Sequence, residues 1–93
     1  MPKIAFYKNF WFFFYVYDLR ERRHVHVEAQ KGRFRNPAKI WFENGVEVAE
    51  PGNLSKKELR LLANIISKNI DVLNKQFDTY IRTGKVKPVK LDY

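Results

Sequence analysis

The stretch Asp18–Glu28, with the sequence DLRERRHVHVE, contains both histidines of the protein beside a cluster of charged residues. From residue 24 onward it alternates polar and apolar side chains, which is typical of a β-strand with one face in the core. The apolar members are predicted to face the core: Val25, Val27 and Ala29. His24 and His26 are therefore expected on the open face of the sheet, about 6.5 Å apart, because two strand steps of about 3.3 Å separate them.

The size and composition predict one small globular domain. The chain has 93 residues, of which 45% are hydrophobic and 16% aromatic, and this is enough for a single core. It has no cysteine, which excludes disulfides and thiolate metal sites. The longest apolar run, Phe10–Tyr17, has eight residues and is far shorter than the ~20 that span a bilayer. No signal-peptide pattern precedes it, so a cytoplasmic location without membrane association is expected.

The charge of the protein is distributed unevenly along the chain. The formal net charge is +8. Residues 1–42 carry nine basic and three acidic side chains, whereas residues 43–54 carry three acidic side chains and no basic one. Such a field favours a polyanion or an acidic protein as partner, and solubility alone is the simpler alternative.

Five segments have the composition and alternation of strands. They are Pro2–Tyr7, Phe10–Tyr17, His24–Gln30, Phe34–Phe42 and Val46–Ala49. Lys8-Asn9 suits a tight turn, and Asn44-Gly45 is a strong hairpin signal because a type I′ turn needs positive φ at both central residues. Short turns between successive strands predict an antiparallel β-meander of four to five strands.

The second of these strands is apolar on both faces. Phe10, Phe12, Phe14 and Val16 are expected on one side, and Trp11, Phe13, Tyr15 and Tyr17 on the other. A strand of this kind lies at the centre of a covered sheet or at a contact with a partner. The sequence leaves open whether the aromatic side is covered within the chain or stacks on a protein or nucleic acid.

The C-terminal half is predicted to be helical. Ser55 and Glu58 form a capping box, and apolar residues then recur with a period of 3.6 up to Tyr80 or Ile81. The pattern continues through Asn69, so one long bent helix and two abutting helices, about 55–68 and 70–82, both fit it. Gly84 is a typical C-terminal stop. The predicted fold class is therefore α+β, with a sheet over residues 2–50 covered by helices over 55–83 in a single domain, 1–84. Residues 85–93 form either a basic tail or an added edge strand.

A combination of short motifs resembles one known family. The motifs are HVHV at 24–27, AKIW at 38–41, the acidic hairpin Glu43–Glu50 and LSKKEL at 54–59. Together they resemble the small bacterial proteins known as domain of unknown function 4160, over about residues 2–83. The resemblance implies a short β-sheet with C-terminal helices, and a gene beside that of another small protein, as in toxin–antitoxin pairs. It supplies no catalytic residues. The chain departs from the family's usual pattern at Arg22-Arg23, where a Pro-Pro pair is common, and at Phe77, where a tryptophan is common.

Three interpretations of the two histidines stay open. In a ribonuclease, His24 and His26 would act as acid and base while Arg22 and Arg23 stabilise charge on phosphorus. In a docking surface, the same face would bind nucleic acid or a partner protein through aromatic and basic side chains. Its members would be Arg20, Arg33, Arg35, Lys39, Trp41, Tyr15 and Tyr17. In a metal site, the HxH pair would supply two ligands, but the chain offers no further histidine or cysteine, and a symmetric dimer would be needed to pool four histidines. No metal ligand and no cofactor are assigned on this basis.

The sequence thus predicts a small basic component of a toxin–antitoxin-like pair. In one form of this prediction the component is the toxin, and it acts on or binds RNA or another nucleic acid. The alternative is a non-catalytic adaptor or nucleic-acid-binding domain that docks a small acidic protein. The expected partners are the small protein from the neighbouring gene and RNA or DNA, and a homodimer stays open. Whether the protein is an enzyme is not decided by the sequence.

Overall fold

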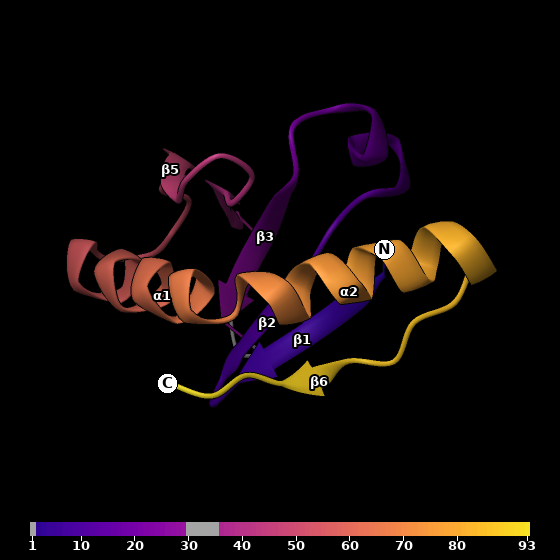
Figure 1. Ribbon diagram of the computed structural model, residues 1–93. Coiled ribbons are helices and arrows are strands. Elements are labelled where there is room, and N and C mark those ends of the chain that lie inside the picture. The colour runs from indigo at the N-terminus through magenta and orange to yellow at the C-terminus, as the bar shows by residue number, and fades with distance from the viewer. Residues whose placement is uncertain (1, 30–35) are drawn as a thin grey trace.

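A computed structural model describes residues 2–29 and 36–93 of the chain. Five strands come first, with one 3₁₀ helix among them: β1 (Lys3–Tyr7), β2 (Phe10–Phe13), η1 (Val16–Arg20), β3 (His24–Ala29), β4 (Ala38–Trp41) and β5 (Glu47–Glu50). The helices α1 (Lys56–Lys68) and α2 (Ile70–Thr83) and a short strand, β6 (Val89–Lys90), follow. The six strands form one sheet in the order β5-β4-β3-β2-β1-β6 (Figure 1).

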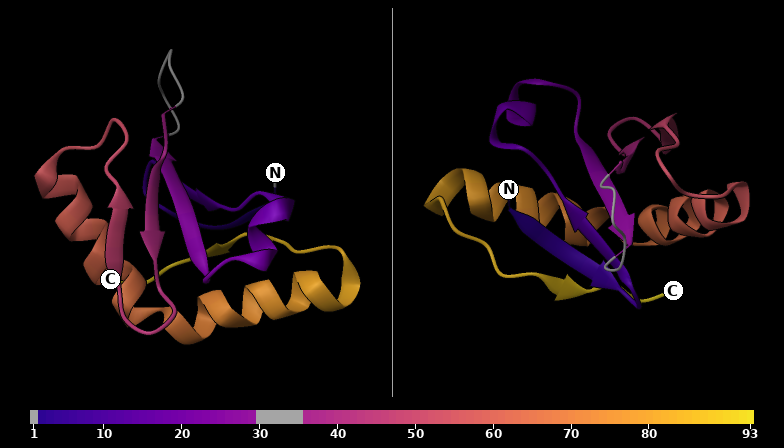
Figure 2. Two further views of the ribbon diagram at one scale, coloured as in Figure 1. Left: turned by 90° about the horizontal axis from the view of Figure 1, so that it is seen from above. Right: turned by 180° about the vertical axis from the view of Figure 1, so that it is seen from behind.

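The first five strands pair antiparallel in sequence order, and β6 pairs parallel with β1. The two helices run along one side of this sheet and meet at an angle (Figure 2). The predicted α+β class, an antiparallel meander with C-terminal helices, is confirmed. Within the described residues, no helix is both long enough and apolar enough to cross a membrane.

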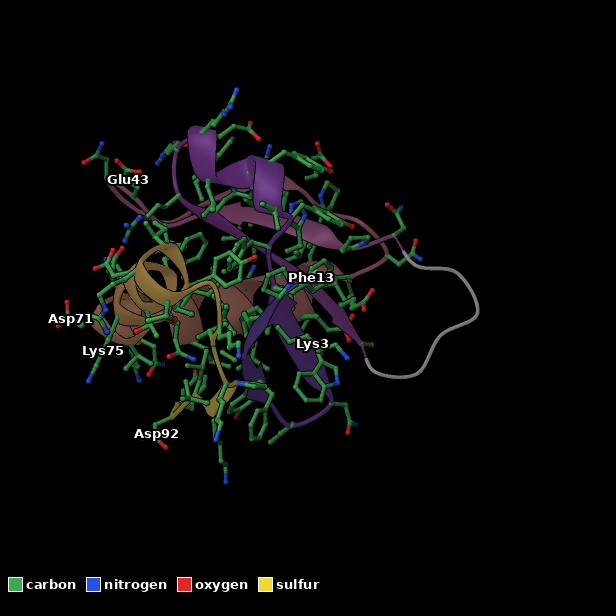
Figure 3. The ribbon with its side chains drawn as sticks, turned by 90° about the vertical axis from the view of Figure 1, so that its right-hand side faces the viewer. Lys3, Phe13, Glu43, Asp71, Lys75 and Asp92 are labelled. Carbon is green, nitrogen blue, oxygen red and sulfur yellow. The ribbon has the colours of Figure 1, made fainter. Side chains whose placement is uncertain are left out.

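The apolar core lies between the sheet and the two helices. The strands contribute alternate residues such as Phe12, Val27 and Ile40, and the helices contribute their apolar stripe. The buried members of that stripe are Leu62, Ile65, Ile66, Leu73 and Phe77. Side chains on the outer surface of α2, such as Asp71 and Lys75, point away from the core (Figure 3). The period of 3.6 in the sequence therefore identified the packed side of the helices.

The second strand is shorter than its apolar run predicted. It ends at Phe13, and residues 16–20 form η1 instead of continuing to Tyr17. The backbone N–H of Tyr15 donates a hydrogen bond of 2.9 Å to the Asp18 carboxylate, which stabilises the turn into η1. Phe14 is buried against Phe77, with ring centroids 4.6 Å apart, whereas Tyr17 is 70% exposed. The turn made by Asp18 therefore overrides the strand propensity of the last residues in the run.

A bulge in β1 changes its predicted alternation. The register with β2 shifts between Lys3 and Ala5, and both Ile4 and Ala5 are fully buried. Strict alternation in the predicted strand Pro2–Tyr7 places Ala5 on the same side as Lys3. This prediction is wrong because the bulge places an extra residue in the strand. Phe6 lies on the other face, with its ring 5.5 Å from that of Trp11.

The turns and caps agree with their sequence signals. Asn44 and Gly45 both have positive φ, 60° and 104°, as the hairpin between β4 and β5 requires. Ser55 and Glu58 form both bonds of the capping box at the start of α1. Gly84 ends α2 in the left-handed conformation and its N–H donates to the Tyr80 carbonyl.

Asn69 divides the helical region into two helices. Its side chain donates to the Ile65 carbonyl at 2.8 Å and to the Asp92 carbonyl at 2.7 Å, so it links the end of α1 to the C-terminal segment. Gln76 on α2 makes a similar link, because its amide donates to the Ile4 and Lys87 carbonyls. Residues 85–93 therefore pack onto the domain and add β6 as an edge strand, with Leu91 buried in the core.

Candidate functional site

The sheet face opposite α1 and α2, here called the helix-free face, is the polar side of the domain. Cross-strand pairing defines its members, because paired residues point to the same side of a sheet. They form three rows: Phe6, Trp11 and Glu28; Lys3, Phe13, His26 and Lys39; and His24 with Trp41. Both histidines therefore lie on one face, as predicted.

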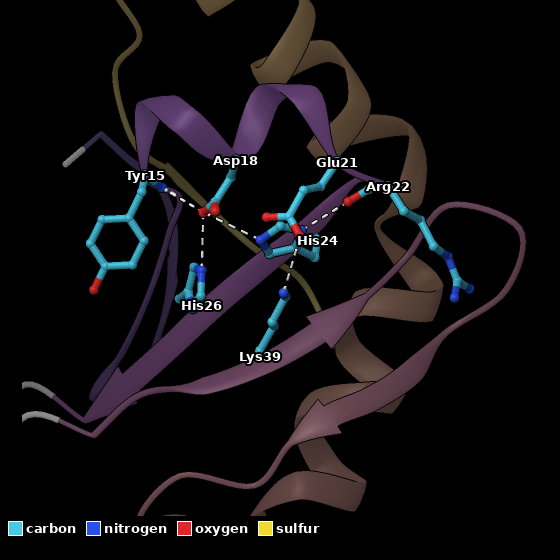
Figure 4. Close-up of polar contacts among 7 residues, drawn as sticks. All are labelled: Tyr15, Asp18, Glu21, Arg22, His24, His26 and Lys39. Atoms are coloured by element: carbon cyan, nitrogen blue, oxygen red, sulfur yellow. Dashed lines mark hydrogen bonds and ion pairs between the residues drawn. The ribbon is translucent and has the colours of Figure 1, made fainter.

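A carboxylate from outside the sheet joins the two histidines. Asp18 in η1 places its Oδ2 atom 3.0 Å from Nε2 of His26 and 3.2 Å from Nε2 of His24. The same oxygen accepts the N–H of Tyr15. Figure 4 shows Asp18 above the two imidazole rings, with β3 beneath them. The local fold of η1 explains this position, since Leu19 packs against the core while the neighbouring Asp18 turns toward the histidines.

The histidines are not on an open surface, and this prediction is wrong. The side chain of His24 has no exposed area, that of His26 is 12% exposed and that of Asp18 is 4% exposed. Neighbouring rings complete the enclosure: Phe13 stacks on His26 at 5.6 Å, and Trp41 lies edge-on to His24 at 4.8 Å. Alternation correctly predicted the face, but it carries no information about a segment such as η1 that covers it.

A hydrogen bond to the backbone shows which ring nitrogen of His24 carries a proton. Nδ1 lies 2.8 Å from the carbonyl oxygen of Arg22. A carbonyl only accepts hydrogen bonds, so Nδ1 carries a proton. The remaining nitrogen, Nε2, is buried and has no hydrogen-bond partner, although it points toward Asp18. Among the described residues, Asp18, His24 and His26 are the one group of three metal-ligating side chains, with ligand atoms within 4.8 Å of one another.

Burial lowers the pKa of His26 below its ordinary value, because desolvation disfavours the charged imidazolium. The nearby Asp18 carboxylate acts in the opposite direction, and the electrostatic interactions with His24 and Lys39 add to the lowering. Desolvation is the largest of these effects. The neutral imidazole is therefore favoured at this position.

The two arginines predicted to stabilise phosphate have other contacts. Arg22 donates from Nε to the Glu43 carbonyl at 2.7 Å, and its guanidinium lies over the ring of Trp41. Arg23 pairs with Asp78 at 2.6 Å and donates to the Asn74 side chain at 2.7 Å, so it joins β3 to α2. The structure therefore brings the histidines together but does not aim these two guanidinium groups at them.

The other predicted binding residues are spread over several places. Arg20 is exposed at the end of η1, and Tyr15 and Tyr17 stack in parallel at 5.4 Å. Arg33 and Arg35 lie outside the residues that the structure describes. Lys39 and Trp41 are adjacent on the helix-free face, with the Lys39 ammonium 4.4 Å from the centre of the Trp41 ring.

The same pairing of a lysine with a tryptophan occurs a second time on this face. The ammonium of Lys3 lies 4.7 Å from the centre of the Trp11 ring. Trp11 and Trp41 are the two tryptophans of the protein, and both are partly exposed. Trp11 pairs with Glu28 of β3, and Trp41 pairs with His24 of β3. These two positions of β3 are four residues apart, which corresponds to roughly 13 Å along the strand.

Comparison with known families gives one match. The family model described as domain of unknown function, DUF4160, matches residues 9–78. The chain belongs to this family. The resemblance seen in its sequence motifs is thereby confirmed, and the match spans β2 to most of α2, including all three members of the Asp18, His24 and His26 cluster. No curated protein and no solved structure matches the chain.

Asp18 is the site residue that sequence reasoning did not find. It precedes His24 by six positions in a segment predicted to follow a strand directly, whereas alternation along His24–Gln30 points to Glu28 as the nearest carboxylate on the face of the histidines. No pattern in the sequence predicts that a single 3₁₀ turn folds back over β3. Lys3 and Trp11 were likewise not predicted to be binding residues, because their pairing depends on the register of β1 against β2.

Proposed function

We propose that the protein binds single-stranded RNA on its helix-free face, as the basic component of a two-protein module of the toxin–antitoxin type. The observation that carries the proposal is that both tryptophans lie on this face with a lysine ammonium within 5 Å of the ring centre. Unpaired bases stack on aromatic rings, and lysines neutralise the adjoining phosphates. The net charge of +8 supports a polyanionic ligand.

The spacing of the two pairs favours a single strand over a duplex. Two rings roughly 13 Å apart along β3 can each stack on a base only if the bases are unpaired and splayed. The pairs therefore suit an oligonucleotide longer than a dinucleotide.

The arrangement gives less support to cleavage by a histidine acid–base pair. A general base has to come within hydrogen-bond distance of the proton that it removes. The side chain of His24 has no exposed area, its Nδ1 is bonded to the backbone, and its Nε2 faces Asp18. The proposed function is therefore binding, and it does not depend on the two histidines reacting with RNA.

A salt series with matched variants tests the proposal. A labelled single-stranded RNA of twelve uridines is titrated with the full-length protein between about 50 and 200 mM salt, with fluorescence anisotropy as the readout. Lys3→Ala and Lys39→Ala should each reduce the slope of log affinity against log salt by about 0.7 if each lysine meets one phosphate. Trp41→Ala should weaken binding by about 1–3 kcal/mol, the contribution of one stacked base.

Lys75→Ala is the matched control, because Lys75 is exposed on α2, on the helix side of the domain (Figure 3). It should leave both affinity and slope close to those of the unsubstituted protein. Equal effects of all three lysine substitutions would contradict a site on the helix-free face. Absence of RNA binding at ~50 mM salt would contradict the proposal and favour the alternative, an adaptor that docks a small acidic protein.

The role in a gene pair is tested in cells. Expression of the protein alone should arrest growth, and co-expression of the small protein from the neighbouring gene should restore it. Lys3→Ala and Trp41→Ala should relieve the arrest to the extent that they weaken RNA binding. Arrest that persists unchanged in both variants would separate toxicity from the proposed RNA-binding face.

A further inference from the structure

The cluster of Asp18, His24 and His26 brings three electron-rich atoms to one buried point. The Asp18 Oδ2 atom lies 3.2 Å from Nε2 of His24 and 3.0 Å from Nε2 of His26, and the three residues each offer one ligand atom within 4.8 Å of the other two. Two of the side chains come from one face of β3 and the third from η1 (Figure 4). The cluster contains none of the tryptophans or lysines on which the proposed RNA binding depends, although Trp41 lies edge-on to His24.

One ring nitrogen of His24, Nε2, has no hydrogen-bond partner in this cluster. Nδ1 donates to the Arg22 carbonyl and therefore carries the proton of the neutral ring. In that ring Nε2 has no proton and carries a lone pair. That lone pair is buried, has no hydrogen-bond partner and faces a carboxylate oxygen. A buried polar atom of this kind costs free energy, and a cation between the three atoms would remove the cost.

The geometry matches a metal ligand set in two further respects. A histidine that binds a metal through one nitrogen usually donates its other N–H to a carbonyl or carboxylate, as His24 does. Ligand atoms around a tetrahedral Zn²⁺ at bond lengths of 2.0–2.2 Å lie about 3.3 Å apart. The two distances to the Asp18 oxygen are close to this value, and no pair of ligand atoms in the cluster is more than 4.8 Å apart, so the two imidazoles would move toward each other around the ion. Two imidazoles and one carboxylate are ligands suited to Zn²⁺ more than to Ca²⁺ or Mg²⁺.

Three basic side chains lie near the cluster, and each has a contact of its own. Arg22 is bonded to the hairpin carbonyl of Glu43, and its guanidinium points away from the cluster (Figure 4). Arg23 is paired with Asp78 on α2. Lys39 pairs with His26 in the register, and its charge disfavours a cation at the cluster. The carboxylate of Glu21, 3.5 Å from its ammonium, offsets part of that charge.

We propose that Asp18, His24 and His26 of a single chain bind one Zn²⁺ through Oδ2 and the two Nε2 atoms. A second copy of the chain is not needed to complete the site, because Asp18 supplies the third ligand beside the HxH pair. Three protein ligands leave one position of a tetrahedral ion for water. Its three ligands are not among the side chains that carry the proposed RNA binding, so either proposal can fail without the other.

Zinc titration of untagged, full-length protein tests the site. The protein is treated with EDTA, dialysed and titrated with Zn²⁺ by calorimetry, and Co²⁺ is added to a second sample to record the visible absorption of a tetrahedral site. One ion per chain should bind. Asp18→Asn and His24→Ala should each weaken the affinity by about 100-fold or more, because loss of a ligand exceeds the 10–100-fold cost of losing a supporting residue. The matched control Asp92→Asn, at an exposed position near the C-terminus, should leave it unchanged.

A second measurement needs no substitution and so does not depend on the variants folding. Two-bond ¹H–¹⁵N spectra of the histidines should show Zn²⁺ shifting both Nε2 resonances while Nδ1 of His24 stays protonated. No stoichiometric binding by the folded wild type would overturn the proposal. Half an ion per chain with dimer formation would also overturn it, because the ion would then bridge two copies.

Discussion

The two faces of the sheet contrast in what holds them together. The face toward α1 and α2 is closed by apolar side chains that need only fit and exclude water, such as Phe12, Val27 and Leu62. The helix-free face is closed at its centre by one carboxylate, two imidazoles and the aromatic rings around them. Burial on the first face is favourable for each group added, whereas burial on the second is favourable only if each polar atom has a partner. The difference predicts that the two faces respond differently to truncation, to loss of charge and to pH.

The largest effects are expected on the helix side. Leu62→Ala and Ile66→Ala each remove a fully buried side chain of α1, and each should lower the free energy of unfolding by about 2–5 kcal/mol, as other core truncations do. Urea titration followed by circular dichroism measures the loss. Glu58→Ala removes only one partner of the capping box and should cost about 1 kcal/mol or less. Similar small losses for all three variants would mean that α1 is not packed on the sheet.

The next largest effect is expected at the centre of the helix-free face. Asp18→Asn weakens the acceptor shared by the Tyr15 N–H and His26 and should cost about 1–3 kcal/mol, the range for a buried polar group that loses its partner. The measurement is made in EDTA, so that a bound metal does not contribute. Asp92→Asn, at an exposed position of the C-terminal segment, should change the free energy of unfolding by less than about 0.5 kcal/mol. If Asp18→Asn lowers the free energy of unfolding no more than Asp92→Asn does, the cluster does not stabilise the fold.

A smaller and more local effect is expected where the C-terminal segment meets the domain. Gln76→Leu deletes the two hydrogen bonds to the Ile4 and Lys87 carbonyls and leaves a side chain of similar size on α2. We expect about 1–2 kcal/mol of destabilisation and faster amide exchange in β6 than elsewhere in the sheet. Exchange that rises equally in β6 and in β3 would show that residues 85–93 do not open separately from the domain.

The sequence predicted the helix side far better than the helix-free face, and the physical reason is the range of the interactions. A period of two or 3.6, the capping box at Ser55 and the Asn44-Gly45 turn are local, so each can be seen within a few residues. The break at Asn69, the bulge after Lys3 and the link made by Gln76 depend on partners distant in the chain. Alternation placed His24 and His26 on one face, but only the fold shows that Asp18 covers them and that Arg23 is bonded to α2. The burial of the candidate site therefore could not be predicted, although its two histidines could.

The smallest effect expected is the pH dependence that His26 gives to stability. Burial lowers the pKa of His26 in the folded protein below 6.5, so between that lower value and 6.5 the unfolded chain binds more protons at this position. Its contribution to stability is therefore complete above about pH 6.5 and decreases as the pH falls through the folded pKa. Urea titrations of EDTA-treated protein at pH 7.5 and pH 5.5, compared with those of His26→Gln, isolate this contribution because the other groups are common to both proteins. The stability advantage of the wild type over His26→Gln should shrink at pH 5.5. An advantage that grows on acidification would mean that attraction to Asp18 outweighs desolvation, and the helix-free face would then be held together by an ion pair instead of a neutral hydrogen bond.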